Sequence, residues 1–208
     1  MAEKSVLLLY AHPSPHRSEI NQPMFEAACR VNGVTAIDLY GEYPRLNIDI
    51  DREQQRLVDH DVVIFQFPLY WYSTPSILKE WQDLVLEYNF AYGSEGTALH
   101  GKRFLCALTA GAGEEAYHTD GYNHFPLNEL LRPLEQTANL TGMEWLPPFV
   151  LFGARTAADD GRLDVHRSQW QSLLEQLTSG SLEPGNLGEF CTLNQYLEGA
   201  QSTGGEAL

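Results

Sequence analysis

The stretch S-V-L-L-L-Y-A-H-P-S-P-H-R-S-E-I-N, residues 5–21, begins with a continuous apolar run and ends where an amphipathic helix starts. Val6 to Leu9 form an unbroken apolar run, the pattern of a strand that is covered on both faces of its sheet. Residues 11–18 then supply hydroxyl groups, imidazole groups and one guanidinium before a helix begins near Ile20. A helix N-terminus favours anions because its first N–H groups lack partners and its dipole is positive there. From this stretch alone, a phosphate site and a plain strand-to-helix loop both stay open.

Bulk composition limits the class of protein. The 208 residues are 43% hydrophobic and 20% charged, which is typical of one globular α/β domain. The net charge of −15 repels nucleic acid and anionic membrane surfaces, so any phosphate ligand needs local donors. No stretch reaches the roughly 18 consecutive apolar residues of a membrane-spanning helix, and residues 1–10 lack a signal-peptide pattern, so we expect a cytoplasmic protein. Cys29, Cys106 and Cys191 lack metal-binding spacing, which predicts free thiols and no metal site.

Apolar runs alternate with helical patterns five times along the chain. The expected strands are residues 6–9, 34–39, 62–67, 103–109 and 143–153. The expected helices are residues 21–31, 52–59, 76–88, 126–140 and 163–177. Short connections and right-handed crossovers then predict an α/β fold, a doubly wound five-stranded parallel sheet in the order 2-1-3-4-5 with helices on both faces.

The last thirty residues depart from this alternation. We predict one domain over residues 1–178 and a partly irregular C-terminal extension over residues 179–208. Phe190, Leu193, Tyr196 and Leu197 form an apolar patch that predicts a short helix on the body or on a partner subunit. We expect residues 199–208 to fray.

Three unusual loops are expected to meet at one edge of the sheet. In an open parallel sheet, ligands bind outside the carboxyl ends of the strands where strand order reverses, here between the first and third strands. Residues 12–18 offer donors for a phosphate, residues 69–73 offer aromatic faces, and residues 109–113 are small enough to let backbone approach a planar ligand. This combination suits a mononucleotide whose large ring is its reactive part. Neither G-x-G-x-x-G nor G-x-x-x-x-G-K-[ST] is present, which disfavours a Rossmann-type NAD site and a P-loop.

Several stretches together resemble a known family. They are YAHPSPHRSEIN, DLYGEYP, IDIDREQ, FQFPLYWYSTPSILKEW, AYGSEGTALHGK, TAGAGEEAY and EWLPPF. They resemble the bacterial NAD(P)H:quinone reductases that serve as ancillary subunits of Kef glutathione-gated potassium-efflux systems and, more distantly, DT-diaphorase. The resemblance spans residues 5–178. It implies a flavodoxin-like fold, an FMN cofactor, and a homodimer whose active sites are shared across the interface.

The resemblance also implies which residues contact the cofactor. The FMN phosphate and ribityl chain are expected at His12, Ser18, Glu19, Ile20 and Asn21. The isoalloxazine ring is expected against Leu69, Tyr70, Trp71, Tyr72, Thr109, Ala110, Gly111 and Ala112, with the aromatic side chains partly in the core. Relatives usually have Thr-Thr-Gly in the last of these loops, whereas this chain has Ala110 and Ala112 at the second Thr and a following Gly. A missing hydroxyl removes one hydrogen bond to the ring, worth about 1 kcal/mol, although backbone donors can still serve.

Tyr117 and His124 correspond to the Tyr and His with which DT-diaphorase-like enzymes assist proton and charge transfer. Placing His124 requires a small alignment gap, so His118 is a rival and a solvated loop histidine is the plain alternative. Taken alone, His12 is an ordinary loop histidine, and its position after the first strand favours a ligand contact. A metal at His12 and His16 is disfavoured, because no further ligand has suitable spacing.

The resemblance implies an FMN-dependent NAD(P)H:quinone oxidoreductase that passes a hydride from NAD(P)H through the flavin to a quinone. The alternative is a regulatory ancillary subunit of a Kef-type transporter with secondary reductase activity, held peripherally at the inner membrane by that partner. Its acidic surface suits a basic cytoplasmic domain. A one-electron flavodoxin is a third interpretation, disfavoured by the aromatic loop and the long loop after the fourth strand. The sequence leaves open the choice between NADH and NADPH, the quinone, and the existence of a Kef partner.

Overall fold

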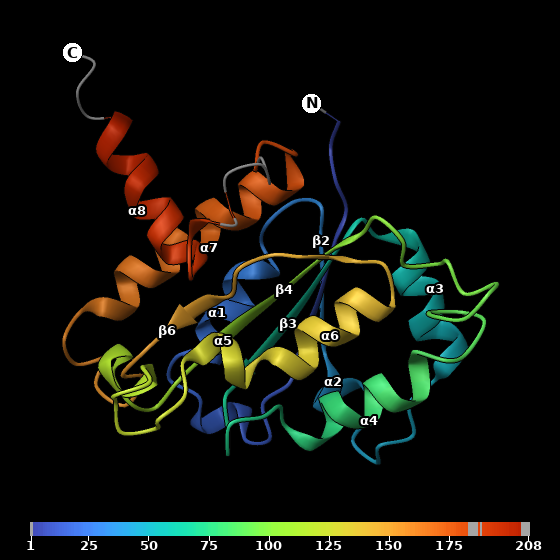
Figure 1. Cartoon of the computed structure of the whole chain (residues 1–208), viewed down its shortest axis with the longest axis horizontal. Coiled ribbons are helices and arrows are strands. Elements are labelled where there is room, and N and C mark those ends of the chain that lie inside the picture. Colours follow the sequence, from blue (N-terminus) through green and yellow to red (C-terminus); the bar gives the residue numbers. More distant parts are fainter. Residues whose placement is uncertain (1, 183–186, 188, 205–208) are drawn as a thin grey trace.

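A parallel sheet with helices on both faces organises the chain (Figure 1). The computed structural model describes residues 2–182, 187 and 189–204. Its strands are β1 (Val6–Tyr10), β2 (Val34–Asp38), β3 (Val62–Pro68), β4 (Arg103–Thr109), β5 (Glu144–Trp145) and β6 (Phe149–Leu151). All pairs between these strands are parallel, in the order β2-β1-β3-β4-β5, with β6 also paired to β4. The predicted order 2-1-3-4-5 is therefore confirmed.

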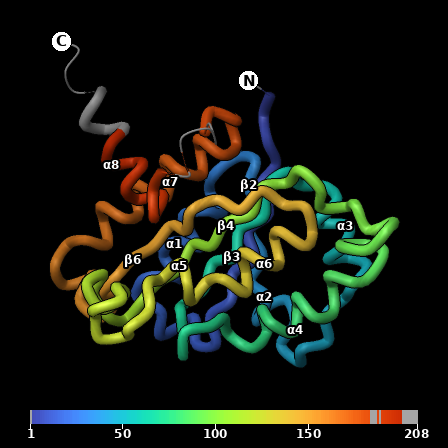
Figure 2. The backbone as a smooth tube through the Cα atoms, viewed as in Figure 1, coloured from blue at the N-terminus to red at the C-terminus, as the bar shows by residue number. Residues whose placement is uncertain are grey.

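Two apolar layers fill the space between the sheet and its helices, because successive side chains of a strand point to opposite faces. In β1, Leu7 and Leu9 belong to one buried cluster, while Leu8 and Tyr10 belong to the other. The first cluster is covered by α2 (Leu39–Glu42), α3 (Ile50–Asp59), α4 (Ser76–Val85), α5 (Leu127–Leu130) and α6 (Arg132–Leu140). The second is covered by α1 (Asn21–Ala28), α7 (Arg162–Thr178) and α8 (Leu193–Gly204), and Figure 2 traces the chain through both layers.

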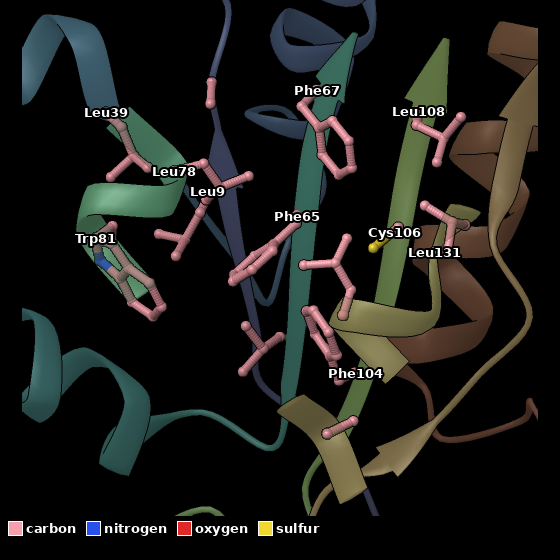
Figure 3. Close-up of a cluster of buried hydrophobic side chains, with 14 of the residues drawn as sticks. Leu9, Leu39, Phe65, Phe67, Leu78, Trp81, Phe104, Cys106, Leu108 and Leu131 are labelled. Carbon is pink, nitrogen blue, oxygen red and sulfur yellow. The ribbon is translucent and has the colours of Figure 1, made fainter. Parts of the chain in front are cut away.

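Figure 3 shows aromatic rings at the centre of the first layer. The Phe65 ring stands edge-on to Trp81 and Phe104, with ring centroids 5.6 Å and 4.7 Å away. The Trp81 indole N–H donates to Glu53, a fully buried carboxylate, over 2.9 Å. Tyr43 also donates to Glu53, over 2.6 Å, and Arg56 pairs with it. The buried charge of Glu53 is thus hydrogen-bonded and paired, as a charge inside a core must be.

Three predicted elements differ from the structure because proline and capping residues interrupt the periodic pattern. The predicted helix over residues 126–140 is two helices, α5 and α6, since Pro133 has no N–H to continue a single helix. The predicted strand over residues 143–153 is likewise two strands, β5 and β6, separated by Pro147-Pro148. The short helix α2 begins at Leu39, the last residue of the predicted strand, and extends into the predicted connection over residues 40–51. The Asp38 carboxylate caps it by accepting from the Tyr40 N–H over 3.1 Å.

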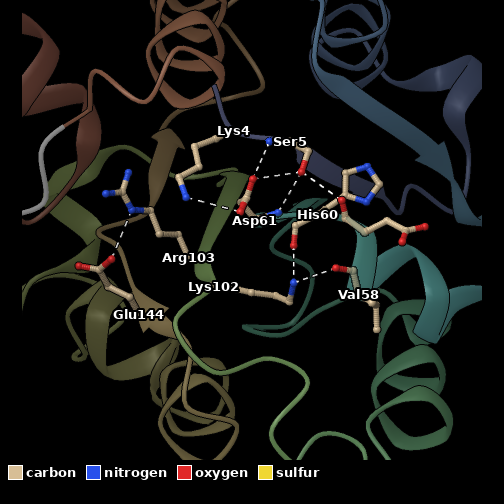
Figure 4. Close-up of polar contacts among 9 residues, drawn as sticks. Lys4, Ser5, Val58, His60, Asp61, Lys102, Arg103 and Glu144 are labelled. Carbon is tan, nitrogen blue, oxygen red and sulfur yellow. Dashed lines mark hydrogen bonds and ion pairs between the residues drawn. The ribbon is translucent and has the colours of Figure 1, made fainter. Parts of the chain in front are cut away.

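Polar side chains close the edge of the sheet at the amino ends of the strands (Figure 4). Asp61 accepts from the Ser5 N–H over 3.0 Å and pairs with Lys4 at 3.5 Å. Lys102 donates to the His60 carbonyl over 2.6 Å. These side chains pair with backbone N–H and carbonyl groups where β1, β3 and β4 begin. The loops discussed below lie at the opposite, carboxyl ends of the strands.

The C-terminal extension packs on the body. Leu193 and Leu197 in α8 are buried in the second cluster, so the helix predicted there is confirmed. The Leu193 N–H donates to Pro148 O over 2.9 Å, and Asn194 Oδ1 accepts from the Val150 N–H over 2.8 Å. Within the segment predicted to fray, residues 199–204 belong to α8 and residues 205–208 lie outside the described residues. The division at residue 178 stays a prediction, although α7 ends at that residue.

Candidate functional site

A cleft of about 820 Å³ opens at the carboxyl ends of β1, β3 and β4, where the sheet's order reverses. The three loops singled out in the sequence meet there. The predicted contacts that line it are His12, Ser18, Glu19, Ile20, Asn21, Leu69, Tyr70, Trp71, Tyr72, Thr109, Gly111, Ala112 and Tyr117. Ala110 is fully buried behind this wall, and its N–H donates to Leu151 O over 2.9 Å. The structure thus brings together most of the expected residues.

His12 is a buried hydrogen-bond donor at one end of the cleft. Its Nδ1 accepts from the Ser14 backbone N–H over 3.1 Å, so the proton of the neutral ring lies on Nε2. Nε2 lies 3.4 Å from the Tyr70 hydroxyl. Burial lowers the pKa of His12, which keeps the ring neutral at pH 7. His12 therefore offers an uncharged N–H to a ligand.

Helix α1 begins beside His12 and directs its N-terminus to the same end of the cleft. Ser18 Oγ accepts from the Gln22 N–H over 3.1 Å, which leaves the hydroxyl hydrogen available to donate. The first N–H groups of a helix have no carbonyl partner within it, so they too are donors. An anionic group fits here, with Arg17 from the short helix η1 (Pro15–Arg17) at the wall.

Asn21 connects this end of the cleft to the strands behind it. Its Nδ2 donates to Thr109 Oγ1 over 2.9 Å, and its carbonyl accepts from Gln66 Nε2 over 2.7 Å. Its Oδ1 is buried and has no hydrogen-bond partner in the described part of the chain. An unpaired buried acceptor is costly, so a ligand hydroxyl that donates to Oδ1 would stabilise this arrangement.

The aromatic loop after β3 has an unusual backbone. Trp71 and Tyr72 have φ values of 51° and 62°, a region that non-glycine residues rarely adopt. The Trp71 side chain is 94% exposed, so the expectation that it packs partly in the core is wrong. The Ser73 N–H closes the turn by donating to Tyr70 O over 3.0 Å. The strained backbone at Trp71 and Tyr72, together with the exposed indole, indicates a surface that contacts a ligand or another chain.

Tyr117 lines the cleft from the short helix η2 (Glu114–Tyr117), in the loop after β4. Its side chain is mostly buried, and desolvation raises the pKa of its hydroxyl. The group therefore keeps its proton at neutral pH and can donate it. His118 and His124 are exposed and do not line the cleft. Of the three residues weighed for catalysis, the structure brings only Tyr117 to the site.

Other residues of the wall were not predicted as contacts. They are Arg17, Pro68, Tyr122, Asn123, Ala154 and Arg155. Tyr72 donates to Asn123 Oδ1 over 3.0 Å, which ties the aromatic loop to the loop after β4. Ala154 and Arg155 follow β6, and the predicted strand over residues 143–153 also ends directly before them. They were missed because only the loops after the first, third and fourth strands were considered for the site.

A doubly wound sheet in this order, with its cleft between the loops after β1, β3 and β4, defines the flavodoxin-like class of α/β proteins. Residues 4–174 match a family model described as having the flavodoxin-like fold, and the chain belongs to this family.

Named relatives extend the comparison. The ancillary protein KefG of the glutathione-regulated potassium-efflux system of Cronobacter sakazakii is 44% identical over 84% of this chain and 95% of its own length. General stress protein 14 from Treponema denticola, solved in complex with FMN, is 33% identical, with a TM-score of 0.79 over 83% of this chain and 99% of that one. An NADPH-quinone reductase from P. pentosaceus is 30% identical, with a TM-score of 0.70 over 84% of this chain and 97% of that one.

Proposed function

We propose that the chain is an FMN-dependent NAD(P)H:quinone oxidoreductase that passes a hydride from NAD(P)H through the flavin to a quinone. The observation that carries the proposal is the cleft itself, which is lined both by donors that suit a phosphate and by a protonated tyrosine. The FMN complex of the Treponema relative and the NADPH-quinone reductase of P. pentosaceus support the same assignment.

The residues present fit FMN. The phosphate would lie against the Ser18 hydroxyl and the first N–H groups of α1, with Arg17 balancing its charge. Oδ1 of Asn21, which has no partner in the described residues, would accept from a ribityl hydroxyl. The ring would lie between residues 69–72 and 109–112, where Gly111 lets backbone come close.

Bound FMN supplies the hydride acceptor and donor, and the protein supplies binding, orientation and charge. Nε2–H of His12 donates toward the ligand without adding charge. The protonated Tyr117 hydroxyl would donate a hydrogen bond, or its proton, to the negative charge that develops on the ring or on the quinone oxygen. Tyr122 and Asn123 of the same loop already line the cleft, so a role for His124 requires its own side chain to turn toward the cleft and stays a prediction.

Absorbance spectroscopy tests the proposal directly. Purified protein should be yellow or should bind added FMN with a one-to-one stoichiometry, and the loaded protein should oxidise NADH or NADPH with a quinone as acceptor. A protein that neither contains nor takes up FMN would overturn the assignment. Activity with one-electron acceptors only, together with a stable semiquinone, would replace it with an electron carrier.

We also propose that the active protein is a homodimer that covers the rim of the cleft. Trp71, Tyr122 and Phe125 are exposed aromatic residues in the two loops at or beside that rim. Exposed aromatic groups that gather beside a site are typical of a surface that another chain covers. Light scattering after size exclusion should give twice the 23.4 kDa of one chain, and Trp71→Ala should shift it toward the monomer.

A second candidate function is an ancillary subunit of a Kef-type potassium-efflux transporter, with the protein cytoplasmic and held at the inner membrane through that partner. Similarity to KefG over 95% of the relative's length favours it, and the net charge of −15 suits a basic docking surface. No helix in the described residues is long and apolar enough to cross a membrane. Co-purification with a Kef transporter, lost at high salt, would support this function.

A further inference from the structure

The segment after β6 is held firmly against the loop that is expected to bind the flavin ring. The Gly153 N–H donates to Ala112 O over 2.7 Å, and the Ala154 N–H donates to Ala110 O over 2.9 Å. Arg162 fixes the same segment from the other side, by donating to the carbonyls of Phe152 and Gly153 over 2.6 Å and 3.1 Å. The backbone directly before Arg155 is thus anchored both to the ring loop and to Arg162.

Arg155 itself forms no hydrogen bond or ion pair within the described residues. Its guanidinium lines the cleft, and a methyl group placed on Gly111 would lie 3.5 Å from its Nε. The chain has 28 acidic residues against 13 basic ones, yet Arg155, like Arg17 of the same cleft wall, has no carboxylate partner within the described residues. Nearby Asp160 is paired with Arg162 instead.

Arg155 and Tyr117 act on the same end of the cleft. Burial raises the pKa of the Tyr117 hydroxyl, and the positive charge of Arg155 opposes part of that rise. The two residues line the same cleft, so the guanidinium can act on the hydroxyl electrostatically. Both line the cleft with the ring loop, whereas the expected phosphate donors come from the start of α1.

We propose that Arg155 stabilises the negative charge that a bound flavin ring gains on reduction. Hydride transfer breaks one C–H bond of the nicotinamide, which is oxidised, and forms one N–H bond on the ring. The ring thereby takes up two electrons and one proton and gains one negative charge. A cation beside that ring binds its reduced form more tightly than its oxidised form. This inference rests on the proposed FMN-dependent function.

The test compares Arg155→Gln with Arg155→Lys and with Arg167→Gln, which removes an exposed charge from α7 outside the cleft. The midpoint potential of bound FMN and the dissociation constant of oxidised FMN are measured for each. In Arg155→Gln, the preference for reduced over oxidised FMN should fall about tenfold, which equals about 30 mV for a two-electron couple. Arg155→Lys should keep most of the preference, and Arg167→Gln all of it.

An unchanged potential in Arg155→Gln with FMN bound would overturn the inference and leave the proposed function intact. An unchanged potential with a raised KM for NADPH, but not for NADH, would overturn it too and assign Arg155 to the nucleotide's extra phosphate. Failure of the unaltered protein to bind FMN would overturn the proposed function and this inference together. Because Arg155 is exposed, thermal unfolding of Arg155→Gln should match that of the unaltered protein.

Discussion

The side-chain amide of Asn21 donates a hydrogen bond to the Thr109 hydroxyl, with 2.9 Å between Nδ2 and Oγ1. The two residues are 88 positions apart, and they come from the loops expected to hold opposite ends of one cofactor. Gln66 adds a second link, because its Nε2 donates to the Asn21 carbonyl over 2.7 Å. The start of α1 is therefore hydrogen-bonded to both β3 and β4.

Replacing Asn21 should weaken FMN binding without unfolding the protein. Asn21→Ala removes the Oδ1 acceptor that is expected to bind a ribityl hydroxyl, a contact worth about 1 kcal/mol, so the dissociation constant should rise about fivefold. Fluorescence titration with FMN measures this. Asn139→Ala, at an exposed position of α6, is the matched control. An unchanged affinity in Asn21→Ala would remove this residue from the site.

Replacing Tyr117 should slow turnover while leaving FMN bound. Tyr117→Phe removes the hydroxyl hydrogen but keeps the ring packed on Phe152, so kcat for quinone reduction should fall about 100-fold, as for loss of a general acid. Because the pKa of Tyr117 is raised, its titration should not reduce activity below about pH 10.

His124→Gln is the matched variant for the competing assignment. The exposed position of His124 predicts a kcat close to that of the unaltered protein. If His124→Gln loses the activity and Tyr117→Phe keeps it, the loop after β4 must rearrange during turnover and the tyrosine is not the donor.

Removing the buried carboxylate of Glu53 should destabilise the fold. Glu53→Ala leaves the Trp81 indole N–H, the Tyr43 hydroxyl and Arg56 without their common partner. The free energy of unfolding should fall by about 3–5 kcal/mol, as for other broken buried pairs. Urea denaturation measures it, with Glu80→Ala on the exposed side of α4 as control. A loss under 1 kcal/mol would show that the pair is dispensable.

His166 should make the protein less stable in mild acid. Burial lowers the pKa of His166 to about 3, whereas an unfolded chain binds the proton near pH 6.5. Between these values the unfolded state holds more protons, so stability is complete above pH 6.5 and falls as the pH drops. His166 alone should lower the free energy of unfolding by about 2 kcal/mol when the pH falls from 7 to 5.

The measurement for His166 is urea denaturation at both pH values. His166→Gln should lose less stability on acidification than the unaltered protein, while His118→Gln, at an exposed position, should behave like the unaltered protein. His166 lines a small cavity beside β6. The polar and charged residues that line it too are Arg162, Gln169, Asn194, Glu198 and, from η2, Glu114. Identical pH dependence in His166→Gln and the unaltered protein would assign the acid sensitivity to other groups.

Much of the fold could be predicted because apolar runs are a local signal. Val6 to Leu9 predict a buried strand from their own composition, and the positions of β3 and β4 follow in the same way. The order of the strands then follows from handedness and short connections. The break between α5 and α6 was missed because Pro133 lies inside a pattern that is otherwise helical.

The site was predicted less completely, since side-chain pairing depends on contacts between distant segments. The loops at His12, Trp71 and Thr109 are visible in the sequence because each follows a strand. Nothing local distinguishes Arg155 from Arg162, yet one lines the cleft unpaired and the other is bound to carbonyl groups and to Asp160. Nor does the sequence show that Trp71 points outward, because its positive φ comes from the turn that Ser73 closes.

The contact between α8 and β6 has a consequence for any shortened form of this protein. The Asn194 side chain accepts from the Val150 N–H, and the Leu193 N–H donates to Pro148 O. The start of α8 therefore makes the backbone hydrogen bonds that a neighbouring strand would make along β6. A chain cut before Leu193 would present β6 as an unshielded template, to which strands of other molecules can add. Self-association of the shortened chain would then result from the removal of α8 and would not represent the assembly of the whole protein.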